Sequence, residues 1–367
     1  MKQFVASVIH FTIVFISCSV TLFAQGKCVD VPMKGMSFLG PQQAPLNIEM
    51  FESLQTTNAE WIALVPEVIL DRQTLSLLPD EENKQWGNTI EAQVEAIKLA
   101  KKTGLKIFLK PHVKLENNRN IGSLVKKWLF IEKDQTGDAT WRGDFMAGNE
   151  KGWQVWESSY ESYILKLAQI AESLDVELFC VGTELRETVI QRPEFWEKLI
   201  KKVRSEYTGS ITYSANWDEF NVVRFWDKLD YIGVNAYFPI STSETPLIDD
   251  TINNWKPIKV QLLEIHKSEG KKILITEYGY RNVSFSGEFP WEHDKGRPPT
   301  NYAAQSNLYE AFYQSFWNES WMAGGFSWNW LHAKLPNNNT DFTIRNKPAS
   351  AILKRWYSQD LKSELKE

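Results

Sequence analysis

Short runs of β-branched and aromatic residues alternate with longer amphipathic segments along most of this chain. The expected strands are residues 34–40, 60–65, 106–112, 177–184, 211–217, 231–237, 272–277 and 324–330. Helices are expected at 48–54, 89–103, 156–174 and 193–209. Alternation of this kind is typical of α/β proteins, and eight parallel strands predict a closed (β/α)8 TIM barrel in a single domain. The segments 114–154, 281–300 and 331–347, rich in Asn, Gly, Asp and Pro, are predicted to be long βα loops that wall a cleft.

The start of the chain differs in composition from the rest. Residues 1–25 are predicted to be a secretory signal peptide, because 4–23 is almost wholly apolar and Leu22-Phe23-Ala24 offers a small-residue cleavage site before Gln25. A flexible segment at 26–33 would lead into the (β/α)8 barrel at 34–358, with a tail at 359–367. The apolar run is also long enough for an uncleaved anchor. The protein is therefore expected to be periplasmic or extracellular, with a membrane-anchored form as the alternative.

Two of the predicted strands end on a glutamate. Glu184 closes the run at 177–184, and Glu277 closes the run at 272–277. The carboxyl ends of the strands carry the chemistry in a (β/α)8 barrel, so both side chains are expected to face one cleft. Two carboxyl groups can cleave a glycosidic bond, one protonating the leaving oxygen and the other attacking the sugar or activating water. A glutamate at a strand end can also be half of an ion pair, but two in matching positions favour a glycosidase.

The composition agrees with a carbohydrate cleft. The chain contains 16 tryptophans, most of them expected in the core, and indole faces pack well on the C–H faces of sugar rings. Several of them lie next to predicted strand ends, namely Trp141, Trp217, Trp291, Trp328 and Trp330. The net charge is −5, with Lys and Arg dispersed among Asp and Glu. Nucleic acid is therefore not an expected partner, and no protein partner is indicated.

Metal and cofactor chemistry are not indicated. The histidines, at positions 10, 112, 266, 293 and 332, show no ligand spacing, and no Gly-rich phosphate loop or Gly-x-Ser-x-Gly elbow is present. Of the cysteines at 18, 28 and 180, the first would leave with the signal and the last fits a small apolar core residue, so no disulfide framework is expected. A barrel lyase or aldolase would need metal ligands or a Schiff-base lysine, for which Lys110 is the only serious candidate.

Three motifs resemble a known family. They are Val-Gly-Thr-Glu at 181–184, Thr-Glu-Tyr-Gly-Tyr at 276–280 and Gly-Gly-Phe-Ser-Trp-Asn-Trp at 324–330. Together they are similar to glycoside hydrolase family 113, a family of retaining β-mannanases and related β-mannosidases in clan A of the glycoside hydrolases. The resemblance covers nearly all of 34–357. It implies a β-linked polysaccharide or oligosaccharide substrate, Glu184 as acid/base and Glu277 as nucleophile, with the two carboxyl groups roughly 5–5.5 Å apart.

One residue departs from the pattern of the clan. Thr183 stands before the acid/base, where most members carry an asparagine that contacts the sugar 2-hydroxyl. The group that contacts this hydroxyl is therefore left open, and the 2-hydroxyl is what separates mannose from glucose. A clan A β-glycosidase acting on glucan or xylan is one alternative to a β-mannanase. A non-catalytic carbohydrate-binding barrel is another, although the presence of both glutamates argues against it.

Further polar and aromatic residues fall at predicted strand ends. Tyr237 is expected to donate a hydrogen bond to Glu277, which needs donors to stay ionised. Lys110 and His112 are candidates for binding sugar hydroxyls, with structural roles as the alternative. Asn216 and Trp217 end the strand at 211–217, where an amide can both donate to and accept from sugar hydroxyls.

The last predicted strand carries two tryptophans in alternate positions. The family resemblance makes Trp328 the stacking surface beneath the sugar that is cleaved, while Trp330 is expected at the rim of the cleft or in the core. Glu67 and Arg142 could reach the cleft, but an exterior ion pair is the favoured expectation for them. Whether the enzyme cuts within a glycan or from its end depends on loop shape, which the sequence does not give.

Overall fold

The computed structural model describes residues 32–39, 45–78, 82, 85–115, 141–292, 299–331 and 339–359. They belong to one compact unit, Val31–Glu367. The predicted signal peptide at 1–25 lies outside the described residues, as do most of 26–33 and of the tail at 359–367. Among the described residues, none of the helices combines the length and the apolar character needed to cross a bilayer.

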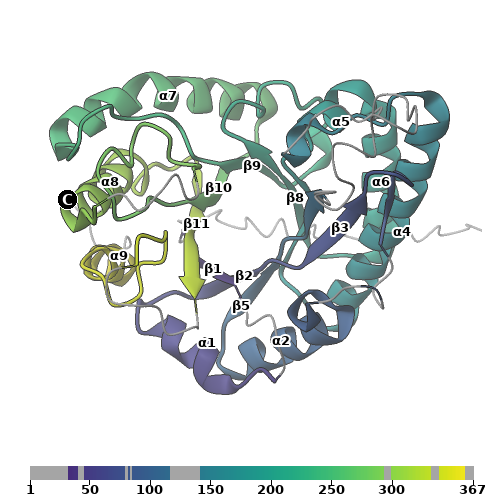
Figure 1. The fold of residues 1–367 in the computed structure, drawn as a ribbon, viewed down its shortest axis with the longest axis horizontal. Coiled ribbons are helices and arrows are strands. Elements are labelled where there is room, and N and C mark those ends of the chain that lie inside the picture. The colour runs from purple at the N-terminus through teal and green to yellow at the C-terminus, as the bar shows by residue number, and fades with distance from the viewer. Residues whose placement is uncertain are drawn as a thin grey trace, which may run out of the picture. The chain divides into compact units, whose positions relative to one another are not determined.

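Eight parallel strands close into a barrel in the order β1-β11-β10-β9-β8-β7-β5-β2, and helices surround them (Figure 1). The strands are β1 (Met33–Leu39), β2 (Trp61–Leu64), β5 (Lys106–Leu109), β7 (Leu178–Thr183), β8 (Ser210–Asn216), β9 (Tyr231–Asn235), β10 (Ile273–Tyr278) and β11 (Met322–Leu331). Each of them coincides with a predicted strand, apart from shifts at the ends. The predicted (β/α)8 barrel is therefore confirmed.

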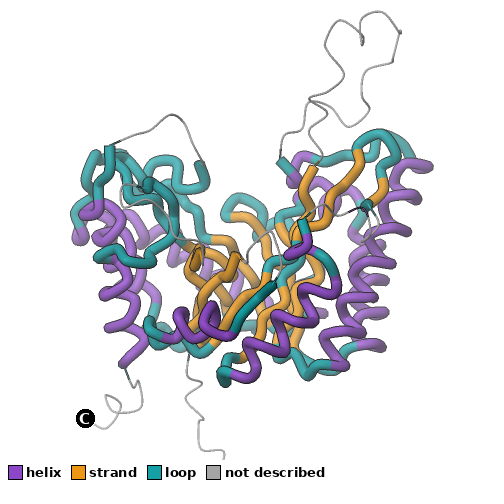
Figure 2. The backbone as a smooth tube through the Cα atoms, turned by 60° about the horizontal axis from the view of Figure 1, so that its bottom comes forward, coloured by secondary structure: helices purple, strands orange, loops and turns teal. Residues whose placement is uncertain are grey.

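Helices flank the strands on both sides in Figure 2. They are α1 (Ile48–Gln55), α2 (Ile90–Lys102), α4 (Glu150–Ser173), α5 (Arg186–Gln191), α6 (Pro193–Glu206), α7 (Ile248–Glu269), α8 (Tyr302–Phe316) and α9 (Ala349–Ser358). Helix α4 begins before the expected residue 156, because the Asn149 side chain accepts a hydrogen bond from the Gly152 N–H and caps the helix. No residue ranges were predicted from the sequence for helices α5, α7, α8 and α9, and α7 contains Pro257 in its interior, which ordinarily disfavours a helix.

The segment expected to form one strand at 106–112 forms two. β5 ends at Leu109, and a separate strand, β6 (His112–Leu115), begins beyond Pro111. Proline has no backbone N–H to contribute to a sheet, which accounts for the break. β6 pairs in parallel with β3 (Glu67–Asp71), and β3 pairs antiparallel with the short β4 (Ser76–Leu77), making a second sheet.

The inside of the barrel changes character along its axis. One apolar cluster is contributed by alternate residues of the barrel strands and includes Trp61, Ala63, Phe108, Leu178, Leu274 and Phe326. The packing is close, because a Cβ on Gly35 would come within 2.3 Å of the Phe326 ring. Toward the carboxyl ends of the strands, the buried residues are polar or charged and include Lys110, Thr183, Asn235 and Glu277. Burying charged groups costs free energy unless they are paired, so the pairing in this layer decides what the site can do.

Candidate active site

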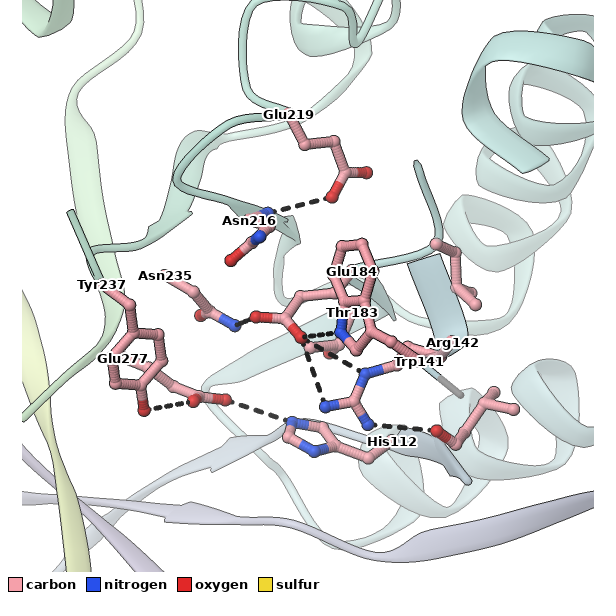
Figure 3. Close-up of polar contacts among 12 residues, drawn as sticks. His112, Trp141, Arg142, Thr183, Glu184, Asn216, Glu219, Asn235, Tyr237 and Glu277 are labelled. Atoms are coloured by element: carbon pink, nitrogen blue, oxygen red, sulfur yellow. Dashed lines mark hydrogen bonds and ion pairs between the residues drawn. The ribbon is translucent and has the colours of Figure 1, made fainter. Parts of the chain in front are cut away.

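A cleft of about 730 Å³ lies at the carboxyl ends of the strands. Glu184 follows β7 and Glu277 lies in β10, and both line this cleft. Its aromatic lining consists of Trp141, Trp217, Tyr237, Trp291, Trp328 and Phe342. The two carboxyl groups predicted from strand ends therefore do face one cavity with aromatic walls (Figure 3).

Glu277 is buried among three donors. The ammonium of Lys110 forms an ion pair with its Oε1, and the Tyr237 hydroxyl donates to its Oε2 at 2.8 Å. The His112 Nε2 lies 3.2 Å from Oε1 (Figure 3). Burial by itself would raise the pKa of Glu277, but the charge of Lys110 and the contact with His112 outweigh it and hold this pKa well below its usual range. Glu277 is therefore an ionised carboxylate, as a nucleophile must be.

Two of these donors stay in one protonation state around neutral pH. Burial, together with the nearby charge of Arg142, lowers the pKa of His112 to about 4, so its imidazole is neutral. Burial also raises the pKa of Tyr237 well above its usual value, so its hydroxyl keeps the proton that it donates. Lys110 thus supplies the positive charge beside Glu277.

Glu184 sits among a different set of donors. The Asn235 Nδ2 donates to its Oε1 at 2.8 Å. Its Oε2 lies 3.3 Å from the Trp141 Nε1 and 3.3 Å from the Arg142 Nη2 (Figure 3). Arg142 is anchored in turn, because its Nη1 donates to the Val113 carbonyl at 3.0 Å. These contacts fix the direction in which the Glu184 carboxyl group points.

The structure brings most of the predicted site residues to the cleft and places the others elsewhere. Tyr237 does donate to Glu277, and His112, Asn216, Trp217 and Trp328 line the cleft as expected. Trp328 is also stacked on His112, with ring centroids 6.0 Å apart and planes 10° from parallel.

Two of the predicted substrate-binding residues lie outside the cleft. The Lys110 side chain is fully buried against Glu277, so it serves the carboxylate and does not bind sugar hydroxyls. Trp330 is a core residue whose indole N–H donates to Ser53 at 3.1 Å.

The expectation of exterior ion pairs was wrong for Arg142, whose partner is Glu184 inside the cleft. For Glu67 the structure shows an ion pair with Lys114 at 3.9 Å, at the edge of the cleft.

Sequence reasoning missed Asn235 and the role of Trp141. Asn235 ends β9 two residues before Tyr237, and its polar side chain at a strand end was an available signal. Trp141 follows a segment, 116–140, that lies outside the described residues, and nothing local marks it as a partner of Glu184. Thr183 is buried and donates to the Pro111 carbonyl at 3.1 Å.

Among the described residues the one cysteine is Cys180, and it is not in a disulfide. Cys180 is fully buried inside the barrel, as expected for a small core residue. Within the described ranges, no group of three or more His, Cys, Asp and Glu side chains is placed to hold a metal ion.

A (β/α)8 barrel with carboxyl groups at the ends of β7 and β10 in one aromatic cleft is the architecture of a glycoside hydrolase. The chain belongs to glycoside hydrolase family 113, whose family model matches residues 40–347. No match was found among curated proteins.

Several solved structures are similar to this chain. A family 113 β-mannanase from Alicyclobacillus acidocaldarius, solved in complex with ManMIm, is 24% identical with a TM-score of 0.74, and the match covers 90% of this chain and 98% of that one. A family 113 β-1,4-mannanase, also solved as a complex, is 25% identical with a TM-score of 0.71 and coverage of 90% and 100%. A β-glucuronidase from Faecalibacterium prausnitzii, 13% identical with a TM-score of 0.57, shares the fold, and the match covers 90% of this chain and 49% of that one.

Proposed function

We propose that this protein is a retaining β-mannanase that hydrolyses β-1,4-mannosidic linkages of mannan, glucomannan or manno-oligosaccharides. The observation that carries the mechanism is the buried, ionised Glu277 held by Lys110 and Tyr237. The substrate follows from membership of family 113 and from the likeness to β-1,4-mannanases at 25% identity over 90% of the chain.

The reaction would proceed in two displacements. In the first, the Glu277 carboxylate attacks the anomeric carbon and forms a glycosyl ester, while Glu184 gives its proton to the departing oxygen. In the second, Glu184 takes a proton from water, the water oxygen bonds to the anomeric carbon, and the ester to Glu277 breaks. The donors around Glu277 keep it charged before the attack, and Trp328 offers a face on which the sugar can stack.

Two variants separate the two carboxyl groups. Glu277→Gln should abolish turnover of every substrate, because no nucleophile is left. Glu184→Gln should abolish turnover of mannan but still release the aryl alcohol from a dinitrophenyl β-mannoside in the first step, since this leaving group needs little protonation. Wild-type activity of either variant on mannan would remove that residue from the mechanism.

The stereochemistry provides a second test. Proton NMR of the first-formed product should show the β-anomer, because two inversions restore the configuration of a β-linked substrate. An initial α-anomer would mean a single displacement, and the nucleophilic role of Glu277 would be wrong.

A glucan or xylan substrate is the alternative, because the group that contacts the sugar 2-hydroxyl separates these substrates from mannan. The buried Thr183 contacts the Pro111 carbonyl, so the position that contacts the 2-hydroxyl in most clan A enzymes is occupied by a side chain engaged elsewhere. Release of reducing sugars from mannan, glucan and xylan, measured side by side, decides between these substrates. A ladder of products from manno-oligosaccharides would show internal cleavage, and monosaccharide alone would show cleavage from the chain end.

We further propose that the protein is exported and acts on glycan outside the cytoplasm. The apolar run at 4–23 and the small residues that follow it support this proposal. Fractionation of expressing cells, with N-terminal sequencing of the exported chain, is the test. Export with cleavage near residue 25 is expected, whereas an uncleaved chain in the membrane would indicate the anchored form.

A further inference from the structure

The backbone at Glu184 is in an unusual conformation. Its φ is 53°, in the left-handed region that residues with a Cβ seldom adopt. Such a conformation costs free energy and persists only where neighbouring contacts hold it. Here the Glu184 N–H donates to the Ser214 carbonyl at 2.9 Å, and the next N–H, that of Leu185, donates to the Tyr213 hydroxyl at 2.7 Å. Both acceptors belong to β8, so this strand holds the turn that carries the acid/base.

The Tyr213 hydroxyl is itself held by a buried carboxyl group. It donates to the Glu219 Oε1 at 2.5 Å, and neither side chain is exposed to solvent. The other oxygen of Glu219 accepts from the Asn216 N–H at 2.9 Å (Figure 3). The Glu219 N–H returns a hydrogen bond to the Asn216 carbonyl at 2.9 Å. Glu219 therefore connects the turn at Glu184 with the end of β8, where Asn216 and Trp217 line the cleft.

Burying the carboxyl group of Glu219 costs free energy, so packing alone does not explain the presence of a glutamate here. Burial raises the pKa of Glu219 to about 8, against the effect of the hydrogen bonds from Tyr213 and Asn216. An apolar side chain of similar volume would avoid this cost but could not accept either hydrogen bond. Both hydrogen bonds that Glu219 accepts lead to the cleft, one through Tyr213 to the acid/base and one directly to its wall.

We propose that Glu219 is a positioning residue, which acts through Tyr213 to orient the acid/base Glu184 and through Asn216 to hold the adjoining wall of the cleft. The proposal rests on the proposed function, because it assigns a role in protonating the leaving group. Glu219 does not touch substrate. Its effect is on the direction of the Glu184 carboxyl group relative to the glycosidic oxygen, where small displacements reduce the rate of proton transfer.

The test compares Tyr213→Phe with a matched control, Tyr207→Phe. Both tyrosines are buried, and both substitutions delete one hydroxyl, but the Tyr207 hydroxyl donates to Val176, which precedes β7 at the far end of the barrel. For each variant, kcat/KM is measured with a dinitrophenyl β-mannoside, whose leaving group needs little protonation, and with phenyl β-mannoside and mannan. Circular dichroism and melting temperature establish how much of each preparation is folded.

Tyr213→Phe should lose about tenfold or more on phenyl mannoside and mannan while staying within about threefold of wild type on the dinitrophenyl substrate. Tyr207→Phe should affect all three substrates equally. An equal loss on all substrates with Tyr213→Phe, or no loss, would overturn the proposal. A purely structural role lowers the folded fraction but does not change the dependence on the leaving group.

Glu219→Gln provides the second variant in case Tyr213→Phe fails to fold. Its amide keeps an oxygen for Tyr213 but places an NH2 group at the Asn216 N–H, so a smaller, leaving-group-dependent loss is expected. The control is Glu206→Gln, at an exposed glutamate of α6. Wild-type dependence on the leaving group in Glu219→Gln would also overturn the proposal. If wild-type protein fails on all β-mannosides, the proposed function is what fails, and the same comparison is made with aryl β-glucosides or β-xylosides.

Discussion

The ammonium of Lys110, the residue after β5, forms an ion pair with the carboxylate of Glu277 on β10, and the lysine side chain has no exposure to solvent. The two residues are 167 positions apart in the chain. A lone buried carboxylate would take up a proton, so the ion pair with Lys110 is what keeps Glu277 ionised.

Replacing Lys110 should therefore disable the nucleophile. In Lys110→Met, Glu277 keeps its burial but loses its counter-charge, so its pKa rises and the acid limb of the kcat/KM profile moves to higher pH. Losing one partner of a buried ion pair should also cost about 3–5 kcal/mol of stability. The control is Lys101→Met, which breaks a half-exposed pair with Glu177 and should leave the pH profile alone. An unchanged acid limb in Lys110→Met would contradict the role given to this pair.

Replacing the two tryptophans of β11 should have different effects, one on turnover and the other on stability. Trp328 lines the cleft, so Trp328→Ala should lower kcat on mannan with little change in melting temperature. Trp330 is 4% exposed, so Trp330→Ala should cost about 3–5 kcal/mol of stability while the surviving folded protein turns over normally. Kinetics and melting curves on the same preparations check both expectations. A large fall in melting temperature with normal turnover in Trp328→Ala would remove its stacking role.

His112 should make the fold sensitive to acid. Its pKa is lowered to about 4 in the folded protein, whereas an exposed histidine has a value near 6.5. Between these values the unfolded chain binds a proton that the folded chain does not, so stability is lost as pH falls, by about 3 kcal/mol at pH 4. Urea unfolding at pH 7 and pH 4 should show this difference, reduced in His112→Gln and retained in His266→Gln. Equal acid sensitivity of wild type and His112→Gln would contradict it.

Glu219 should make the fold less stable as the pH rises, whereas His112 makes it less stable as the pH falls. Its pKa is raised to about 8 in the folded protein from an ordinary value of 4.5. Between these values the folded chain holds a proton that the unfolded chain has released, so this contribution falls as pH rises, by on the order of 4 kcal/mol up to pH 8. Glu219→Gln cannot ionise, and its unfolding free energy should decline less between pH 5 and pH 8 than that of wild type. Parallel curves for the two proteins would show that Glu219 does not titrate in this range.

The sequence by itself determined the barrel and the two carboxyl groups. Strands are marked by local runs of β-branched and aromatic residues, and parallel strands in a barrel all present their carboxyl ends at one edge. Knowing that Glu184 and Glu277 end two such strands was therefore enough to place them in one cleft. Tyr237 was found in the same way, because it also follows a strand end.

The contacts of these groups were decided by the tertiary structure. Glu184 meets Arg142 and Asn235 across 42 and 51 residues of sequence, and no local pattern distinguishes these partners from other polar residues. Lys110 was buried against Glu277 outside the cleft, and Trp330 was packed into the core while Trp328 was left in the cleft. Periodicity fixes which residues form a strand. A hydrogen bond or ion pair, in contrast, needs atoms placed within a few tenths of an ångström. Only the packing of the elements against one another sets those positions.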